Sequence, residues 1–217
     1  MDKPFSEACA RNCEPILAVL RTVLQPCRSV LEIGSGTGQH AVHFGAHLPH
    51  LQWQTSDLAE NHAGIRAWIA AAQPGNVLAP ITLDMAAPAW PGRPFDALYT
   101  ANTCHIMSWP QVEAMMAGVA HVLEPQGVLC IYGPFNYNGA YTSEGNARFD
   151  AALRQPMSHR GIRDVEAMQG LASRNGLWLQ ADHAMPANNR LLLFARGSAT
   201  AVTPAFVTPM SSTARRR

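Results

Sequence analysis

Short apolar runs alternate with helical patterns along most of the chain. The run Ser29–Ile33 is apolar and β-branched and precedes a cluster of glycines, which predicts a buried strand. Similar runs predict further strands at 51–57, 77–83, 95–100, 128–132, 177–184 and 190–195. Between them, apolar residues spaced by three and four predict helices at 14–25, 39–48, 60–73, 110–123, 146–153 and 164–174.

This order of elements predicts an α/β fold. Strands that alternate with helices build a mostly parallel, doubly wound, Rossmann-like sheet with helices on both faces. We expect one domain over residues 1–196, and a disordered tail over 197–217, which is small, polar and proline-containing. Ligands of such sheets bind beyond the carboxyl ends of the strands, so the residues that follow each strand are the candidates for function.

Composition narrows the class of protein. Hydrophobic residues make up 47% of the 217 residues and charged residues 14%, which excludes a disordered chain. The net charge of +1 makes nucleic acid an unlikely partner, and no apolar stretch is long enough to span a membrane. There is no secretory signal pattern, and the cysteines are odd in number and scattered, which favours reduced thiols in the cytoplasm: Cys9, Cys13, Cys27, Cys104 and Cys130.

The loop after the first predicted strand is rich in glycine. It reads Glu32-Ile33-Gly34-Ser35-Gly36-Thr37-Gly38. Glycines let a ligand lie against the backbone. A dinucleotide fingerprint requires glycine where Gln39 stands, and a P-loop requires a Gly-Lys-Ser/Thr that is missing. Both motifs serve phosphates, so this loop favours a cofactor without one, bound by Glu32, Gly34, Gly36 and Gly38.

Polar residues follow the next predicted strands as well. Asp57, with Leu58 beside it, ends the second strand at the place where an acid accepts hydrogen bonds from ribose hydroxyls. Asp84 and the apolar Met85 follow the third strand and are predicted to pair with an adenine and cover its face, and Asn102 follows the fourth. The alternative is that the two aspartates cap the turns that follow them.

These motifs together resemble the class I S-adenosylmethionine-dependent methyltransferases. More narrowly, the chain resembles the family of domain of unknown function 938, the methyltransferase-like 26 type, from about residue 5 to 196. The matching segments are Ala10-Arg11-Asn12, Pro15-Ile16-Leu17, Gly36-Thr37-Gly38-Gln39-His40, Asp57, His105-Ile106, Tyr132-Gly133-Pro134-Phe135 and Met185-Pro186-Ala187-Asn188-Asn189. The resemblance implies a seven-stranded sheet with an antiparallel last strand and S-adenosylmethionine as cofactor, with S-adenosylhomocysteine as product.

His105 is the candidate catalytic base, because it follows the fourth strand and an imidazole is suited to proton removal near neutral pH. The alternative is a structural histidine bonded to a loop. Substrate contacts are predicted for two residues near the start of the chain and three after the fifth strand, with ordinary surface polarity as the alternative: Arg11, Asn12, Asn136, Tyr137 and Tyr141.

Three histidines, His40, His43 and His47, are spaced by three and four along one predicted helix. Paired histidines at this spacing can chelate a metal, but an H-E-x-x-H signature is missing and no carboxylate in the motif completes a ligand set. We therefore predict a solvated helix face and no metal. Cys9 and Cys13 are likewise expected to serve helix packing.

The predicted function is methyl transfer from S-adenosylmethionine to a small molecule through a thiol, amine, hydroxyl or carboxyl group. A protein methyltransferase and a non-catalytic module that binds S-adenosylmethionine are the alternatives. The acceptor and the oligomeric state stay open.

Overall fold

Seven strands form one continuous sheet in the order β3-β2-β1-β4-β5-β8-β7 in a computed structural model that describes residues 3–197. Their bounds are β1 Ser29–Ile33, β2 Gln52–Asp57, β3 Val77–Thr82, β4 Phe95–Ala101, β5 Leu123–Asn136, β7 Leu177–Met185 and β8 Asn189–Arg196. The first five strands run parallel, and β8 runs antiparallel to β5. A two-residue strand, β6 (Arg163–Asp164), pairs with the end of β5. The predicted Rossmann-like sheet with an antiparallel last strand is confirmed.

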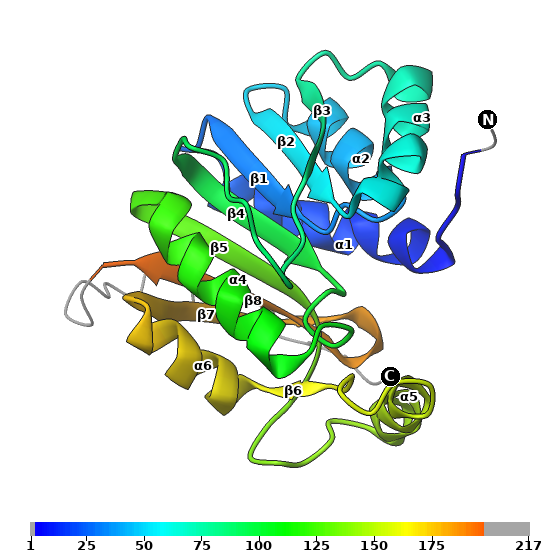
Figure 1. Cartoon of the computed structure of the whole chain (residues 1–217), viewed down its shortest axis with the longest axis vertical. Coiled ribbons are helices and arrows are strands. Elements are labelled where there is room, and N and C mark those ends of the chain that lie inside the picture. The colour runs from blue at the N-terminus through cyan, green and yellow to red at the C-terminus, as the bar shows by residue number, and fades with distance from the viewer. Residues whose placement is uncertain (1–2, 198–217) are drawn as a thin grey trace, which may run out of the picture.

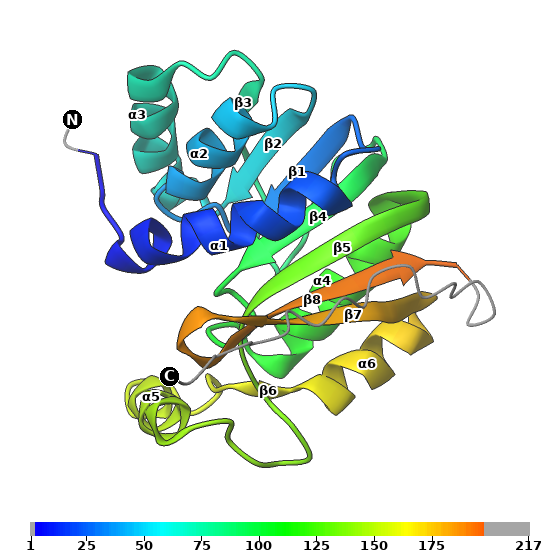
Figure 2. The same ribbon diagram turned by 180° about the vertical axis from the view of Figure 1, so that it is seen from behind.

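Helices cover both faces of this sheet (Figures 1 and 2). Their bounds are α1 Glu7–Val23, α2 Gln39–His47, α3 His62–Ala72, α4 Trp109–Val122, α5 Glu144–Arg154 and α6 Val165–Arg174, with 3₁₀ turns at Ala59–Asn61 and Pro186–Asn188. One core cluster joins the sheet to α4 and α6, and the other joins it to α1 and α2. Helix α5 lies beyond the end of the sheet (Figure 1).

The strand order reverses between β1 and β4. From β1 the chain continues outward to β2 and β3, then returns to place β4 on the other side of β1. The loops after β1 and β4 therefore diverge to opposite faces and leave a crevice at their carboxyl ends. This crevice is where the fold places a ligand.

Helix α1 begins at Glu7, seven residues before the predicted start, so the predicted bounds of 14–25 were wrong. The Ser6 side chain caps the helix by accepting a hydrogen bond from the Cys9 amide at 3.3 Å. Pro15 lies inside the helix, where it lacks the N–H that would bond to the Arg11 carbonyl. Burial of the apolar side of α1 offsets the missing hydrogen bond. Because proline is over-represented at the first position of helices, Pro15 predicts a helix start instead.

Strand β5 is longer than predicted at both ends. The segment from Gly133, predicted as a loop, stays in the sheet because Gly133 and Pro134 pair with Arg190 and Asn189 of β8. The predicted turn at 124–127 enters the strand through a register shift against β4. Long-range pairing thus overrides local glycine and proline signals.

None of the helices within residues 3–197 is long and apolar enough to cross a membrane. The predicted disordered tail lies, except for Gly197, outside the described residues, as does the basic run Arg215–Arg217.

Candidate functional site

A cavity of about 870 Å³ opens at the carboxyl ends of β1, β2, β4 and β5, at the reversal of strand order. One wall is the glycine loop with the end of β2, and the opposite wall is the loop after β4 with α5. The N-terminal half of α1 and the 3₁₀ turn after β7 close the sides. The cavity brings together eight of the predicted site residues: Arg11, Asn12, Gly34, Gly36, Asp57, Leu58, Asn102 and His105.

The glycine loop presents bare backbone to the cavity. Gly36 has a φ of +57°, and a Cβ atom built on it meets no atom within 4 Å, so the space beside it belongs to the cavity. Gly34 has a φ of +71°, and a Cβ there would lie 2.5 Å from the Thr103 side chain. Glycine is therefore required at 34 by the close approach of the loop after β4, and at 36 by its backbone conformation.

Asp57 holds the loop to the end of β2. One carboxylate oxygen accepts a hydrogen bond from the Gly36 amide at 2.6 Å. The other accepts from the Leu58 amide and the Asn61 side chain, both at 2.7 Å. The side chain is buried, yet it lines the cavity. A carboxylate has about four acceptor sites, so Asp57 keeps capacity for a ligand hydroxyl.

Glu32 lies behind the glycine loop, not on the cavity wall. It is 2% exposed, and one carboxyl oxygen accepts hydrogen bonds from the Ser35 hydroxyl at 2.9 Å and the Trp53 indole at 3.0 Å. Burial raises the pKa of this carboxyl to about 7. Glu32 thus supports the loop from below and does not line the cavity in which a ligand would bind.

Asn12 is fixed from inside the core. Its side-chain oxygen lies 2.6 Å from Nε2 of the buried His40, whose other ring nitrogen lies 3.4 Å from the Tyr99 hydroxyl. An amide oxygen only accepts, so Nε2 of His40 carries the proton. Burial lowers the pKa of His40 to about 4, which keeps the ring neutral. Asn12 is therefore a rigid polar group on the cavity wall.

Gln39 attaches α1 to the glycine loop. Its side-chain oxygen accepts from the Ser6 amide at 2.5 Å and from the Thr37 hydroxyl at 3.0 Å. The residue that excludes a dinucleotide fingerprint thus has a structural task of its own.

His105 lies on the opposite wall and is 6% exposed. Burial first, and then the nearby Arg163 and Arg160, lower the pKa of His105 to about 4. The ring packs edge-on against Phe149 of α5, with centroids 5.3 Å apart. Within residues 3–197 no side-chain hydrogen bond to His105 is found, so a neutral imidazole with free hydrogen-bonding capacity lies beside the cavity.

The cavity leaves out the other predicted site residues besides Glu32. Gly38 packs against α3, where a Cβ would lie 2.9 Å from the Ile65 backbone. Asp84 caps a turn by accepting from the Ala86 amide at 2.8 Å, and Met85 is part of the core. Asp84 therefore follows the capping alternative in its contacts.

Three predicted substrate residues also lie off the cavity lining. Asn136 is buried at the end of β5, and its side-chain oxygen has no hydrogen-bond partner among the described residues. Tyr137 donates to Asp182 at 2.5 Å, and Tyr141 donates to Asp150 at 2.8 Å. Both hydroxyls are therefore engaged in contacts that hold the loop.

Other residues on the cavity wall were missed by sequence reasoning. Four of them come from α5 and the turn after β7: Asn146, Phe149, Pro186 and Ala187. Ala187 and Asn188 both have a φ of +57°. The segment 185–189 was visible as part of the resemblance, but its distance from the glycine loop in sequence gave no reason to place it at the same cavity.

The prediction for the three helical histidines was wrong in two respects. His40 is buried and bonded to Asn12, so it does not share a solvated face with the others. A carboxylate does accompany His43 and His47, because α1 brings Glu14 beside them.

The comparisons with known proteins agree with this fold. A model of the family described as "Protein of unknown function (DUF938)" matches residues 3–196. An O-methyltransferase family protein from Burkholderia thailandensis has a TM-score of 0.76 and 20% identity over 89% of this chain and 58% of that one. The S-adenosylmethionine-dependent methyltransferase SibL, in its apo form, has a TM-score of 0.75 and 19% identity over 88% and 56%.

A third similar structure is an O-methyltransferase family 2 protein from Planctomyces limnophilus DSM 3776 in complex with apigenin. It has a TM-score of 0.73 and 18% identity over 86% of this chain and 56% of that one. The chain therefore spans rather more than half the length of these proteins, and it has the fold of the class I S-adenosylmethionine-dependent methyltransferases.

Proposed function

The chain belongs to the DUF938 family, and we propose that it is a methyltransferase that moves the methyl group of S-adenosylmethionine to a hydroxyl of a small, uncharged, largely apolar molecule. The observation that carries the proposal is one cavity with two unlike walls. A glycine loop with Asp57 forms one, and His105 with apolar side chains forms the other. We expect the protein to act in the cytoplasm.

The first wall fits the cofactor. Asp57 at the end of β2 has acceptor capacity for ribose hydroxyls, and the bare backbone at Gly36 leaves room for a ligand. The cavity volume of about 870 Å³ accommodates a nucleoside with an amino-acid arm and leaves space for an acceptor. The cofactor assignment of Asp84 and Met85 is given up in this proposal, because both are engaged outside the cavity.

The second wall favours an apolar acceptor. Two large hydrophobic side chains on this wall stay exposed and line the cavity, namely Ile106 and Phe149. Exposed apolar surface that lines a concave site is typical of a ligand pocket. On the wall formed by His105 and α5 no charged side chain lines the cavity within the described residues, which counts against a charged acceptor.

His105 is proposed to receive the acceptor's proton. Bound S-adenosylmethionine supplies a methyl group activated by a sulfonium. With S-adenosylmethionine held by Asp57 and the glycine loop, transfer of its methyl group to the acceptor oxygen would release the hydroxyl proton, and His105 would take that proton. Transfer would remove the positive charge of the sulfonium as His105 gains one, so the net charge of the buried site would stay the same. That balance offsets the lowered pKa of the free histidine.

Two measurements test the proposal. Calorimetry with S-adenosylhomocysteine should show one saturable site. Incubation with methyl-labelled S-adenosylmethionine and a cell extract, separated by size, should place the label in small molecules that partition into organic solvent. A protein carrying the label would support a protein methyltransferase instead. Cofactor binding with label in neither fraction would point to a binding module, and lack of cofactor binding would refute the proposal.

A further inference from the structure

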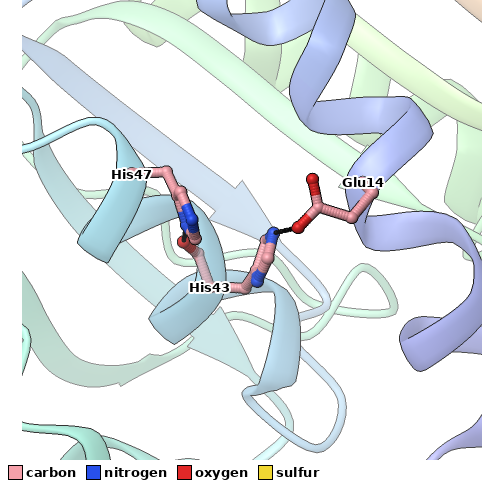
Figure 3. Close-up of side chains that lie close together, drawn as sticks. All are labelled: Glu14, His43 and His47. Atoms are coloured by element: carbon pink, nitrogen blue, oxygen red, sulfur yellow. Dashed lines mark hydrogen bonds and ion pairs between the residues drawn. The ribbon is translucent and has the colours of Figure 1, made fainter.

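We propose a second site on the outer face of α1 and α2, where Glu14, His43 and His47 bind one divalent transition-metal ion of the Zn²⁺ type. This site is separate from the cavity, whose lining contains none of the three residues. Figure 3 shows the carboxylate of Glu14 on α1 directed toward the ring of His43 on α2, with the ring of His47 beside that of His43.

The distances suit a shared ion. The candidate ligand atoms of the three residues lie within 4.8 Å of one another, and Nε2 of His43 is 3.2 Å from a Glu14 oxygen. Ligands of a tetrahedral zinc ion lie about 3.4 Å apart, given bonds of about 2.1 Å. One pair is thus at ligand spacing, and small side-chain rotations bring in the third.

Nε2 of His43 is the best-placed ligand atom of the three residues. Within residues 3–197 this buried nitrogen makes no hydrogen bond, and its one recorded contact is the ion pair with a Glu14 oxygen at 3.2 Å. A buried nitrogen of this kind is uncommon. A metal ion would bind the nitrogen and the carboxylate together.

His47 is held in the tautomer that a metal requires. Its Nδ1 lies 2.8 Å from the backbone carbonyl of His43, which only accepts, so Nδ1 carries the proton. The lone pair of the neutral ring is then on Nε2. A ligating histidine commonly donates its other N–H to a carbonyl in this way, which fixes the ring. The His43 and His47 rings are 4.5 Å apart between centroids, as expected for neighbours on one helix face.

The donor set selects the class of ion. Two imidazoles and one carboxylate suit Zn²⁺, Ni²⁺ or Co²⁺, whereas Mg²⁺ and Ca²⁺ prefer oxygen ligands. The Glu14 side chain is 71% exposed, so water completes the coordination. Burial first, then His47 and last Arg21 on α1 lower the pKa of His43, and the positive charge of Arg21 opposes a cation, which limits the affinity. Bound metal would join α1, which carries Asn12 and Cys9 on the cavity wall, to α2.

The test is a titration of the untagged protein with zinc chloride, followed by calorimetry, with cobalt chloride as a spectroscopic substitute. We expect one saturable site and a higher melting temperature with metal, since the ion binds only the folded helix pair. Glu14→Gln and His47→Ala should each lower the affinity about tenfold or more. Both side chains are exposed, so the variants should unfold at the wild-type temperature without metal.

Matched controls come from α4, where Glu113→Gln and His121→Ala change the same residue types at exposed positions. They should bind metal as the wild type does. Wild-type binding that is equal in all four variants would overturn the site, as would the lack of saturable binding. Thiolate charge-transfer bands with cobalt would also overturn it, because they would assign the metal to the partly exposed Cys9 or Cys13.

Discussion

The two walls of the cavity differ in how far their polar groups are already satisfied. On the glycine-loop wall, the Asp57 carboxylate accepts from three donors of its own chain, and Glu32 below it accepts from two. On the opposite wall, His105 has a ring without a side-chain hydrogen bond among the described residues, and Phe149 keeps 41% of its surface exposed. The first wall is preorganised before any ligand binds. The second wall has apolar surface and an imidazole that are still available to contact a ligand.

This difference indicates how the work of the site is divided. A wall whose groups are fixed suits a ligand that never changes, such as a cofactor. A wall of apolar surface with one free imidazole suits the methyl acceptor, which it would select by shape and by contact with the imidazole. Changes on the two walls should therefore separate into effects on cofactor affinity and effects on turnover.

The largest expected effect is on the acceptor wall. His105→Ala should lower kcat about 10²- to 10⁴-fold, the usual contribution of a general base, with cofactor affinity unchanged. Because its pKa is lowered to about 4, His105 is neutral at all higher pH values. The acid limb of kcat/KM in the wild type should therefore fall near pH 4 to 5 rather than near the ordinary value of about 6.5.

Steady-state kinetics measures the turnover, and calorimetry with S-adenosylhomocysteine measures the cofactor affinity. His105→Gln retains a hydrogen-bonding side chain but removes the base, and it should be nearly as slow as His105→Ala. An equal loss of cofactor affinity and turnover in both variants would assign His105 a structural role.

Glu32 tests the glycine-loop wall through stability. Its folded pKa is about 7, above its ordinary value of 4.5, so between these values the unfolded chain loses the proton while the folded protein keeps it. The contribution of Glu32 to the free energy of unfolding therefore decreases as pH rises through this range, by on the order of 3 kcal/mol. Glu32→Gln does not titrate and should lack that decrease.

Urea unfolding of both proteins at about pH 5 and about pH 8 gives the change in the free energy of unfolding between the two pH values. The effect is the difference between this change in the wild type and in Glu32→Gln. The comparison with the variant removes the contributions of the buried histidines, which are common to both proteins. Equal pH dependence in the two proteins would mean that Glu32 is ionised in the folded state and that the loop is not supported as described.

The same contrast explains how much the sequence could predict. The glycine loop and Asp57 lie 21 residues apart and follow neighbouring parallel strands, so local patterns predict both their structure and their meeting. The acceptor wall joins Phe149 and Ala187 to His105 across long sequence separations. Their meeting depends on the packing of α5 and on the pairing of β5 with β8, which no local periodicity records.

Helix α1 shows the other limit. Its first two turns carry Ser6 as a cap and Asn12 as a buried polar residue, and both line the cavity. Sequence reasoning missed those turns because proline is common at the first position of a helix, so Pro15 predicted a later start. Asp84 shows a further limit, because its place after a strand predicts a ligand contact while its hydrogen bond in the structure is to the Ala86 amide of its own turn.

Asp57→Ala should weaken cofactor binding by about 1–3 kcal/mol, roughly five- to 150-fold, because it removes a buried acceptor from the wall and frees the Gly36 amide. Calorimetry measures the affinity. Asn61→Ala is the matched control, since it removes one hydrogen bond to Asp57 and keeps the carboxylate, and its effect should be smaller. Equal effects of the two changes would assign Asp57 to loop structure alone.

The smallest expected effect comes from Phe149→Ala. The ring contacts His105 at 5.3 Å between centroids and lines the cavity, so its loss removes apolar surface that an acceptor would cover. The acceptor's KM should rise about three- to tenfold, equivalent to about 1 kcal/mol, with cofactor affinity unchanged. Met157→Ala removes a similarly exposed apolar side chain away from the cavity lining and should leave KM as it was. If Phe149→Ala raised KM and weakened cofactor binding equally, the two walls would act as one binding surface. The acceptor wall would then help to position the cofactor, as Asp57 does on the opposite wall.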